Sequence, residues 1–147
     1  MLEKAKLMAV VRVRGYFGMN PKRKTTLIML NLPRANNCTV LHPSPSYLGM
    51  LHEVKDFATW GEIGQKTLAK LVEKRGRKNG NIACKGAKEA ETLAAEIMGG
   101  KTLAESGLDK TFRLTPPTGG WKGKKMTFPE GDLGKRGSID ELLARMI

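Results

Sequence analysis

The chain has 147 residues, and its 26 lysines and arginines against 14 aspartates and glutamates give a formal net charge of +12. A chain of this length has room for one domain, or for two small halves that share a core. Hydrophobic residues make up 40% of the sequence, which excludes a disordered basic tail. Because no apolar run approaches the roughly 20 residues that span a bilayer, the sequence also excludes a membrane-spanning protein.

The N-terminus and the cysteines predict a reducing, cytoplasmic location. The first apolar patch is interrupted by Arg12 and Arg14, so it lacks the continuous apolar stretch of a secretory signal. Cys38 and Cys84 stand alone, and we interpret both as reduced, small hydrophobic residues. A large positive charge in such a compartment makes a polyanion, above all nucleic acid, the first partner to consider.

The N-terminal segment predicts a strand followed by a helix. In residues 7–15, valines alternate with Arg12 and Arg14, which predicts a strand that carries both guanidinium groups on one face. Asn20 followed by Pro21 is a typical helix start. We therefore expect a helix with a basic entrance.

Two more strands and a helix complete a predicted core at residues 1–63. Residues 38–41 favour a strand, Ser44-Pro45 begins a helix, and residues 57–63 form a third strand with Trp60 in the core. The helix is expected to place four apolar side chains on one face: Tyr47, Leu48, Leu51 and Val54. This order predicts an α+β fold with a ferredoxin-like split βαβ core, a small antiparallel sheet with helices on one face.

Residues 64–147 predict a mostly helical extension packed on that core. The helices expected from apolar spacing and capping boxes lie before Gly76, at residues 87–98, after Lys101 and from Ser138 to Met146. The segment from Phe112 to Gly137 shows no periodicity, and we expect it to be long, basic and mostly irregular.

Residues that carry catalytic chemistry are few and poorly spaced. His42 and His52 stand in no metal-binding arrangement. Glu130 and Asp132 flank a glycine, with no apolar segment that would separate their pKa values. Gly123-Lys124 lacks the first glycine and the following Ser or Thr of a phosphate-binding loop. We therefore expect no metal, no cofactor and no small-molecule substrate.

Positive charge is concentrated in three windows of the sequence. Residues 1–25 hold seven basic residues and one acidic residue, residues 66–88 hold eight and one, and residues 110–137 hold seven and two. Any one window could be a solvated face. In three such windows, however, the positive charges repel one another and lower the stability of the fold unless a polyanion neutralises them. Glycine, asparagine and proline turns beside the cations allow close approach to phosphates. The pattern favours nucleic acid as the partner.

Two local motifs bear on how RNA would be held. Trp121 lies among glycines and lysines, where it either stacks on an exposed base or pins the loop onto the protein. Gly134-Lys135-Arg136-Gly137 resembles the G-x-x-G clamp of KH domains, although no helix is expected directly before it. Aromatic residues are too sparse for a stacking platform across a sheet.

Several motifs, in order along the chain, resemble one known family. They are MAVVRVRG (8–15), KRK (22–24), PSPSYLGML (43–51), WGEI (60–63), FRLTPPTGG (112–120) and EGDLGKRG (130–137). Together they resemble the large-subunit ribosomal protein L30 family, with the extension of its archaeal and eukaryotic members. Without the long basic N-terminal extension of the eukaryotic members, the chain resembles the archaeal type. The resemblance implies a ferredoxin-like core and a structural role, embedded in large-subunit ribosomal RNA near the 5S RNA.

The residues and the resemblance lead to the same expected function. We expect a structural constituent of the large ribosomal subunit that contacts large-subunit ribosomal RNA, 5S ribosomal RNA and neighbouring ribosomal proteins. The residues expected to bind RNA are Arg12, Arg14, Lys22, Arg23, Lys24, Arg75, Arg77, Lys78, Lys85, Arg113, Trp121, Lys122, Lys124, Lys125, Lys135 and Arg136. Most of them would contact phosphates, so binding should weaken as salt increases.

Two other functions remain open from the sequence alone. A small RNA-acting enzyme would use Asp132 or His42, and its turnover would be lost when those residues are replaced. A DNA-packaging protein would bind random duplex DNA as tightly as ribosomal RNA. Neither function accounts for the ordered motifs along the chain.

Overall fold

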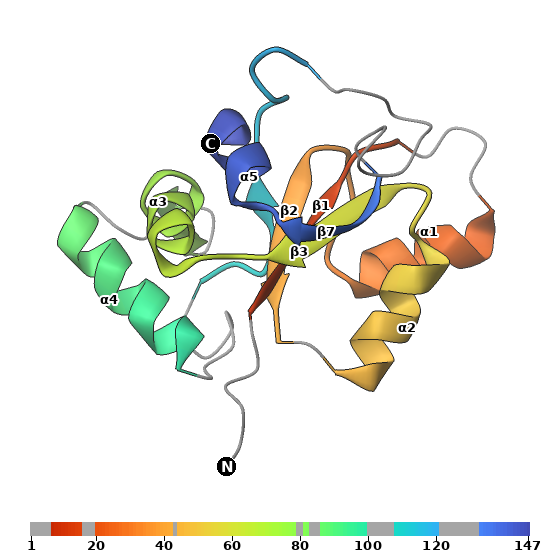
Figure 1. Cartoon of the computed structure of the whole chain (residues 1–147), viewed down its shortest axis with the longest axis horizontal. Helices are drawn as coiled ribbons and strands as arrows, with labels where there is room; N and C mark the ends of the chain where they lie inside the picture. Colours follow the sequence, from red (N-terminus) through yellow and green to blue (C-terminus); the bar gives the residue numbers. More distant parts are fainter. Residues whose placement is uncertain are drawn as a thin grey trace.

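The structure of the chain, a computed structural model, describes residues 7–15, 20–42, 44–78, 81–82, 86–99, 108–120 and 133–147. A β-α-β-α-β unit comes first, with β1 (Met8–Arg12), α1 (Pro21–Met29), β2 (Asn37–Leu41), α2 (Pro45–Glu53) and β3 (Ala58–Glu62). The later elements are α3 (Gln65–Arg75), β4 (Arg77–Lys78), β5 (Asn81–Ile82), α4 (Ala87–Met98), β6 (Phe112–Arg113), β7 (Gly134–Ser138) and α5 (Asp140–Met146). The predicted α+β class and the split βαβ order are confirmed (Figure 1).

A five-stranded sheet in the order β6-β2-β1-β3-β7 forms the centre of the fold. β1 lies antiparallel between β2 and β3, with Val10 opposite Thr39 on one side and Trp60 on the other. β6 extends the sheet antiparallel to β2, whereas β7 runs parallel to β3 along the other edge. The prediction of an antiparallel sheet is therefore confirmed for β6, β2, β1 and β3, but not for β7. The proposed division at residues 63 and 64 stays a prediction, and both edge strands come from the later part of the chain.

The expectation that residues 112–137 are mostly irregular is wrong at both ends of this segment, where the edge strands β6 and β7 lie. β6 has only two residues, and β7 has the sequence Gly-Lys-Arg-Gly-Ser, which contains no β-branched or aromatic residue. Both strands form by pairing with the core, and the Thr59 hydroxyl also donates to the Gly134 carbonyl oxygen at 2.9 Å. Such tertiary pairing overrides local propensity and leaves no local sequence signal.

Helices cover both faces of the sheet (Figure 1). α1 and α2 pack on one face against a cluster that includes Met8, Val10 and Trp60, which confirms the predicted core position of Trp60. α3, α4 and α5 pack on the other face against a cluster that includes Ala9 and Val11. All five residues of β1 are buried as a result. The helices of the βαβ unit therefore lie on one face, and the extension covers the other.

The two helices of the βαβ unit begin where the sequence predicts. Asn20 and Ser44 are their N-caps, and each side chain accepts a hydrogen bond from a backbone amide of the first turn. The predicted apolar face of α2 is only partly right, because Leu51 is buried whereas Tyr47 and Leu48 are 40% and 47% exposed. α2 thus contacts the sheet through a narrower stripe than its apolar spacing suggests.

The helices of the extension also match their predicted positions. α4 spans the predicted residues 87–98, α5 ends at Met146, and α3 stops before Gly76. A Cβ atom at Gly76 would collide with the backbone carbonyl oxygen of Val72, so glycine is needed there for close approach. The helix expected after Lys101 lies outside the described residues.

The start of α5 differs from the predicted capping box. Ile139, rather than Ser138, is the N-cap, and its side chain makes no capping hydrogen bond. Asp140 in the first turn instead accepts a hydrogen bond from the Gly64 backbone amide at 2.9 Å. This contact fixes α5 to the start of α3.

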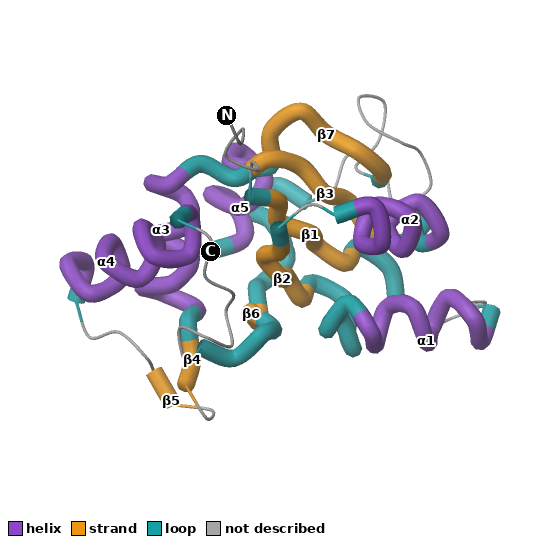
Figure 2. Tube along the Cα trace, turned by 90° about the horizontal axis from the view of Figure 1, so that it is seen from below, coloured by secondary structure: helices purple, strands orange, loops and turns teal. Residues whose placement is uncertain are grey.

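β4 and β5 pair with each other in a small antiparallel hairpin outside the main sheet. Figure 2 shows the hairpin on the side of the molecule where β6 forms the sheet edge. The backbone amide of Asp109 donates to the Arg77 carbonyl oxygen at 2.7 Å, which joins β4 to the segment before β6. The hairpin therefore lies beside the sheet edge.

Candidate nucleic-acid interface

One end of the sheet collects arginines from segments that are far apart in the sequence. β1 and β6 finish at this end, and β2 and β3 begin there, as their antiparallel register requires. The parallel strand β7 also begins there, with Gly134 opposite Thr59. We call this region the basic end of the sheet, defined by Arg14 after β1, Arg34 before β2 and Arg113 at the close of β6.

Arg12 also lies at this end of the sheet, but it is buried and therefore does not belong to the surface of the candidate interface. Its side chain is fully buried, its Nε donates to the Arg14 carbonyl oxygen at 2.8 Å, and one terminal nitrogen donates to the Leu32 carbonyl oxygen at 2.8 Å. The prediction that Arg12 binds RNA beside Arg14 is therefore wrong, because the segment after α1 covers its side chain. Arg12 instead positions the loop that carries Arg34.

Arg14 and Arg23 converge on the aromatic ring of Phe57. Their guanidinium carbons lie 5.1 and 5.6 Å from the ring centroid, which are cation–π distances. Phe57 is buried, and its carbonyl oxygen accepts hydrogen bonds from the backbone amides of Val13 and Arg14 at 2.8 and 3.1 Å. A buried ring therefore orders two half-buried cations beside the basic end.

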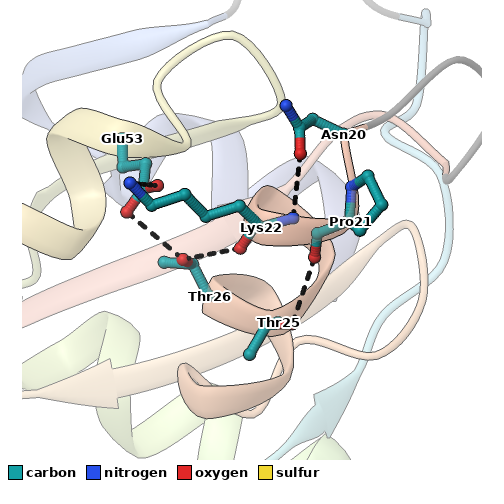
Figure 3. A network of polar contacts seen from close by, with 6 residues as sticks. All are labelled: Asn20, Pro21, Lys22, Thr25, Thr26 and Glu53. Atoms are coloured by element: carbon teal, nitrogen blue, oxygen red, sulfur yellow. Dashed lines mark hydrogen bonds and ion pairs between the residues drawn. The ribbon is translucent and has the colours of Figure 1, made fainter.

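The amino end of α1 adds further cations next to this pair. Lys22 Nζ lies 3.6 Å from Glu53 Oε1, and the Thr26 hydroxyl lies 3.3 Å from Glu53 Oε2 (Figure 3). Glu53 therefore offsets part of the charge of Lys22 and orients its exposed side chain. Lys24 follows on the same helix turn. Because a helix amino terminus carries partial positive charge, this turn attracts anions even with Glu53 nearby.

A second group of cations lies where the extension meets the sheet edge. Arg75 ends α3 and is half-buried, Arg77 is exposed in β4, and Arg113 is exposed in β6. The backbone contact between β4 and the segment before β6 brings Arg77 and Arg113 to one side of the molecule. The fold thus unites cations from two separate charge windows.

Some of the residues predicted to bind RNA are only partly described or not described. Lys85, Trp121, Lys122, Lys124 and Lys125 lie outside the described residues. Lys78 lies on β4, and Lys135 and Arg136 lie on β7. The resemblance of residues 134–137 to a G-x-x-G clamp is not matched by the structure, in which this segment is a strand paired with β3.

The residues expected to bind RNA did not include three residues of this region: Phe57, Arg34 and Lys110. Lys110 lies beside Arg77 and Arg113, and it was counted in the charge window at residues 110–137 without being named. The contact of Phe57 with two arginines depends on tertiary packing, and Arg34 lies outside the three charge windows. The sequence does carry a weak signal for Arg34, because two asparagines, Asn31 and Asn36, flank it. In the structure both asparagines adopt positive φ, at 62° and 64°. Asparagine tolerates this left-handed conformation better than most residues, so the pair marks a sharply turned loop.

The described part of the chain contains some of the residues considered for catalysis or metal binding. Within it, no group of three or more His, Cys, Asp or Glu residues is arranged to hold a metal. His42 is half-buried and His52 is exposed. Cys38 is buried, which raises the pKa of its thiol and fits its predicted role as a small hydrophobic residue. Glu130, Asp132 and Cys84 lie outside the described residues.

No helix among the described residues is long and apolar enough to cross a membrane. Fold and charge together define a class of protein: a small, basic α+β chain whose central sheet gathers arginines at one end.

The family model of ribosomal protein L30p/L7e matches residues 8–57, from β1 to the turn before β3. The chain is 42% identical, over 96% of its length, to large ribosomal subunit protein uL30 of Methanosphaera stadtmanae and covers 100% of that relative. The uL30 proteins of Nanoarchaeum equitans and Archaeoglobus fulgidus are 40% and 39% identical over 96% and 95% of the chain, which covers 99% of each. The chain therefore belongs to the ribosomal protein L30p/L7e family, as its motifs predicted. Members of this family are structural proteins and not enzymes.

Proposed function

We propose that this protein is a structural constituent of the large ribosomal subunit in the cytoplasm, and that its basic end binds large-subunit ribosomal RNA. The observation that carries the RNA contact is the strand register, which brings Arg14, Arg34 and Arg113 to one end of the sheet. The names of the archaeal relatives support the place in the large subunit. 5S ribosomal RNA and neighbouring ribosomal proteins are its further partners.

The mechanism follows from the charges of RNA. RNA helices that pack together repel each other through their phosphates, and cations held between them reduce this repulsion. Arg14 and Arg23 on their shared ring, with the first turn of α1, form one group of such cations. Shape and contacts to 2′-hydroxyl groups, rather than a base code, give selectivity for folded RNA.

The experiment is a binding titration of the full chain with a large-subunit ribosomal RNA transcript at 50 and 200 mM salt. About 6 to 10 phosphate contacts predict an affinity loss of about a thousandfold to a hundred-thousandfold over this range. Random duplex DNA serves as the competitor, and it should bind more weakly. Equal affinity for duplex DNA, or a nearly constant affinity across the salt range, would overturn the proposal.

The enzyme hypothesis is tested with the same RNA. Incubation with the purified protein should leave the transcript intact, and the variants Asp132→Asn and His42→Ala should behave like the wild type. Multiple-turnover cleavage that either substitution abolishes would contradict a structural role.

A further inference from the structure

A notch of about 290 Å³ is lined by residues of β4, of the edge strand β6 and of the segment directly before β6. It is lined by Arg77, Asp109, Lys110, Thr111 and Arg113. Three of these five residues are cations and one is a carboxylate, so the lining carries an excess of positive charge. The cations come from two segments that are more than 30 positions apart in the sequence.

Hydrogen bonds hold both sides of the notch in place. The Asp109 amide donates to the Arg77 carbonyl oxygen at 2.7 Å, which fixes the two segments to each other. The Thr111 hydroxyl donates to the Asn31 carbonyl oxygen at 2.6 Å, and Arg113 pairs with Asn37 in the sheet. The cations therefore extend from a backbone that is ordered before any ligand binds, which reduces the entropy lost on binding.

The chemistry of the lining points to a phosphate group. Guanidinium groups match phosphate oxygens with paired N–H donors, and Lys110 adds a third cation whose side chain is exposed. Among the described residues that line the notch, none has an aromatic ring on which a base could stack. Its three cations therefore suit the charged backbone of a nucleotide chain.

We propose that this notch seats backbone phosphates of ribosomal RNA, with Arg77, Lys110 and Arg113 as the binding residues. The proposal rests on the proposed function: the notch shares Arg113 with the basic end and adds Arg77 and Lys110 at the sheet edge. It also assigns a role to Lys110, which was counted in the third charge window but was not among the residues expected to bind RNA.

A second, larger hollow supplies a matched control. It lies beside the start of α3, where Lys66 and Lys70 share the lining with three carboxylates, from Glu73, Glu91 and Asp140. Because carboxylates outnumber cations there, this hollow disfavours phosphate. Replacing its two lysines removes the same charge as replacing two notch arginines, but at a place where no phosphate contact is expected.

The test compares wild type with a double variant that carries both Arg77→Gln and Arg113→Gln. For each protein, the affinity for a large-subunit ribosomal RNA transcript is measured at several salt concentrations. Each lost phosphate contact should lower the slope of log affinity against log salt by about 0.7 to 0.9, and each arginine should account for about a tenfold loss of affinity. Lys66→Gln with Lys70→Gln should change affinity less than about twofold. Lys110→Gln alters one exposed side chain and should lower the slope by about 0.7 to 0.9, the value for one phosphate contact. This single variant keeps the proposal testable if the double arginine variant does not fold.

The outcomes separate the notch from the wider function. If wild type binds with a steep slope and the notch variants keep that slope, the notch proposal is overturned while RNA binding stands. If wild type itself does not bind, the proposed function fails. Inorganic phosphate is titrated alone as a second probe, with the Arg113 side-chain NMR signals as readout. Saturation by inorganic phosphate, without any change in the RNA slope of the variants, would assign the notch to a free anion and also overturn the proposal.

Discussion

Arg14 and Arg23 lie over the same phenyl ring, with their guanidinium carbons 5.1 and 5.6 Å from the centroid of Phe57. The contact links the segment after β1 to the first turn of α1 and holds two like charges near each other. Such an arrangement is unfavourable by itself and becomes favourable when an anion neutralises it. We therefore expect the ring to hold the two guanidinium groups in place before RNA binds.

Replacing the ring tests this idea without removing a charge. Phe57→Leu keeps an apolar side chain in the core but removes the π-face, so we expect about a fivefold loss of RNA affinity with an unchanged salt slope. Binding titrations of folded protein at several salt concentrations measure both quantities. An unchanged affinity would show that the ring does not order the two arginines for binding.

Arg12 is expected to govern stability rather than RNA contact. Arg12→Met leaves the carbonyl oxygens of Leu32 and Arg14 without these donors in a buried site, which should lower the free energy of unfolding by about 2–4 kcal/mol. Arg34→Met, on an exposed loop, should change it by less than about 0.5 kcal/mol. Urea titration measures both variants. A fully stable Arg12→Met protein that binds RNA poorly would reassign Arg12 to the interface.

Two glycines in helical regions should respond in opposite directions to alanine. Gly76→Ala forces a Cβ atom against the Val72 carbonyl oxygen and should destabilise the protein by about 1–3 kcal/mol. Gly49 lies inside α2 with open space around it, so Gly49→Ala should stabilise by about 0.5–1 kcal/mol. Thermal unfolding compares the two. A neutral Gly76→Ala would mean that the close approach relaxes without loss.

Cys38 should make stability depend on pH above neutrality. Burial raises the pKa of its thiol in the folded state, whereas the pKa of the unfolded thiol is about 8.5. Below that pH both states keep the proton and stability is unaffected. Above it only the unfolded state loses the proton, so the free energy of unfolding should fall by about 1.4 kcal/mol for each pH unit.

The control for this prediction is Cys38→Ala, with Cys84→Ala present in both proteins. The additional decrease between pH 8 and pH 10 should be present with Cys38 and absent without it. Urea titrations at the two pH values measure the difference. Identical pH dependence in the two proteins would show that the thiol ionises as readily in the folded state.

The parts of the fold that depend on local chemistry could be predicted from the sequence. Asn20-Pro21 and Ser44-Pro45 start α1 and α2 as expected, because capping and proline geometry act within one turn. The apolar spacing of residues 87–98 likewise gives α4 its bounds. These signals fix the element order, and the order fixes the split βαβ class.

The parts that depend on distant contacts could not be predicted. Alternation predicted Arg12 and Arg14 on one face of the first strand, with both residues binding RNA, but a sheet covered on both faces buries every residue of β1, Arg12 included. β7 forms from a glycine-rich basic segment because β3 offers an unpaired edge. The same limit applies to the candidate interface: charge windows identified Arg77 and Arg113 separately, and only the fold places them around one notch.

The measurement that tests the central claim most directly is sedimentation of a cell lysate through sucrose gradients at moderate and at high salt, with this chain tracked across the fractions. The account predicts that the chain migrates with the large ribosomal subunit at moderate salt and is released only at high salt, because charge contacts hold it. Migration as a small free protein at moderate salt would contradict the account.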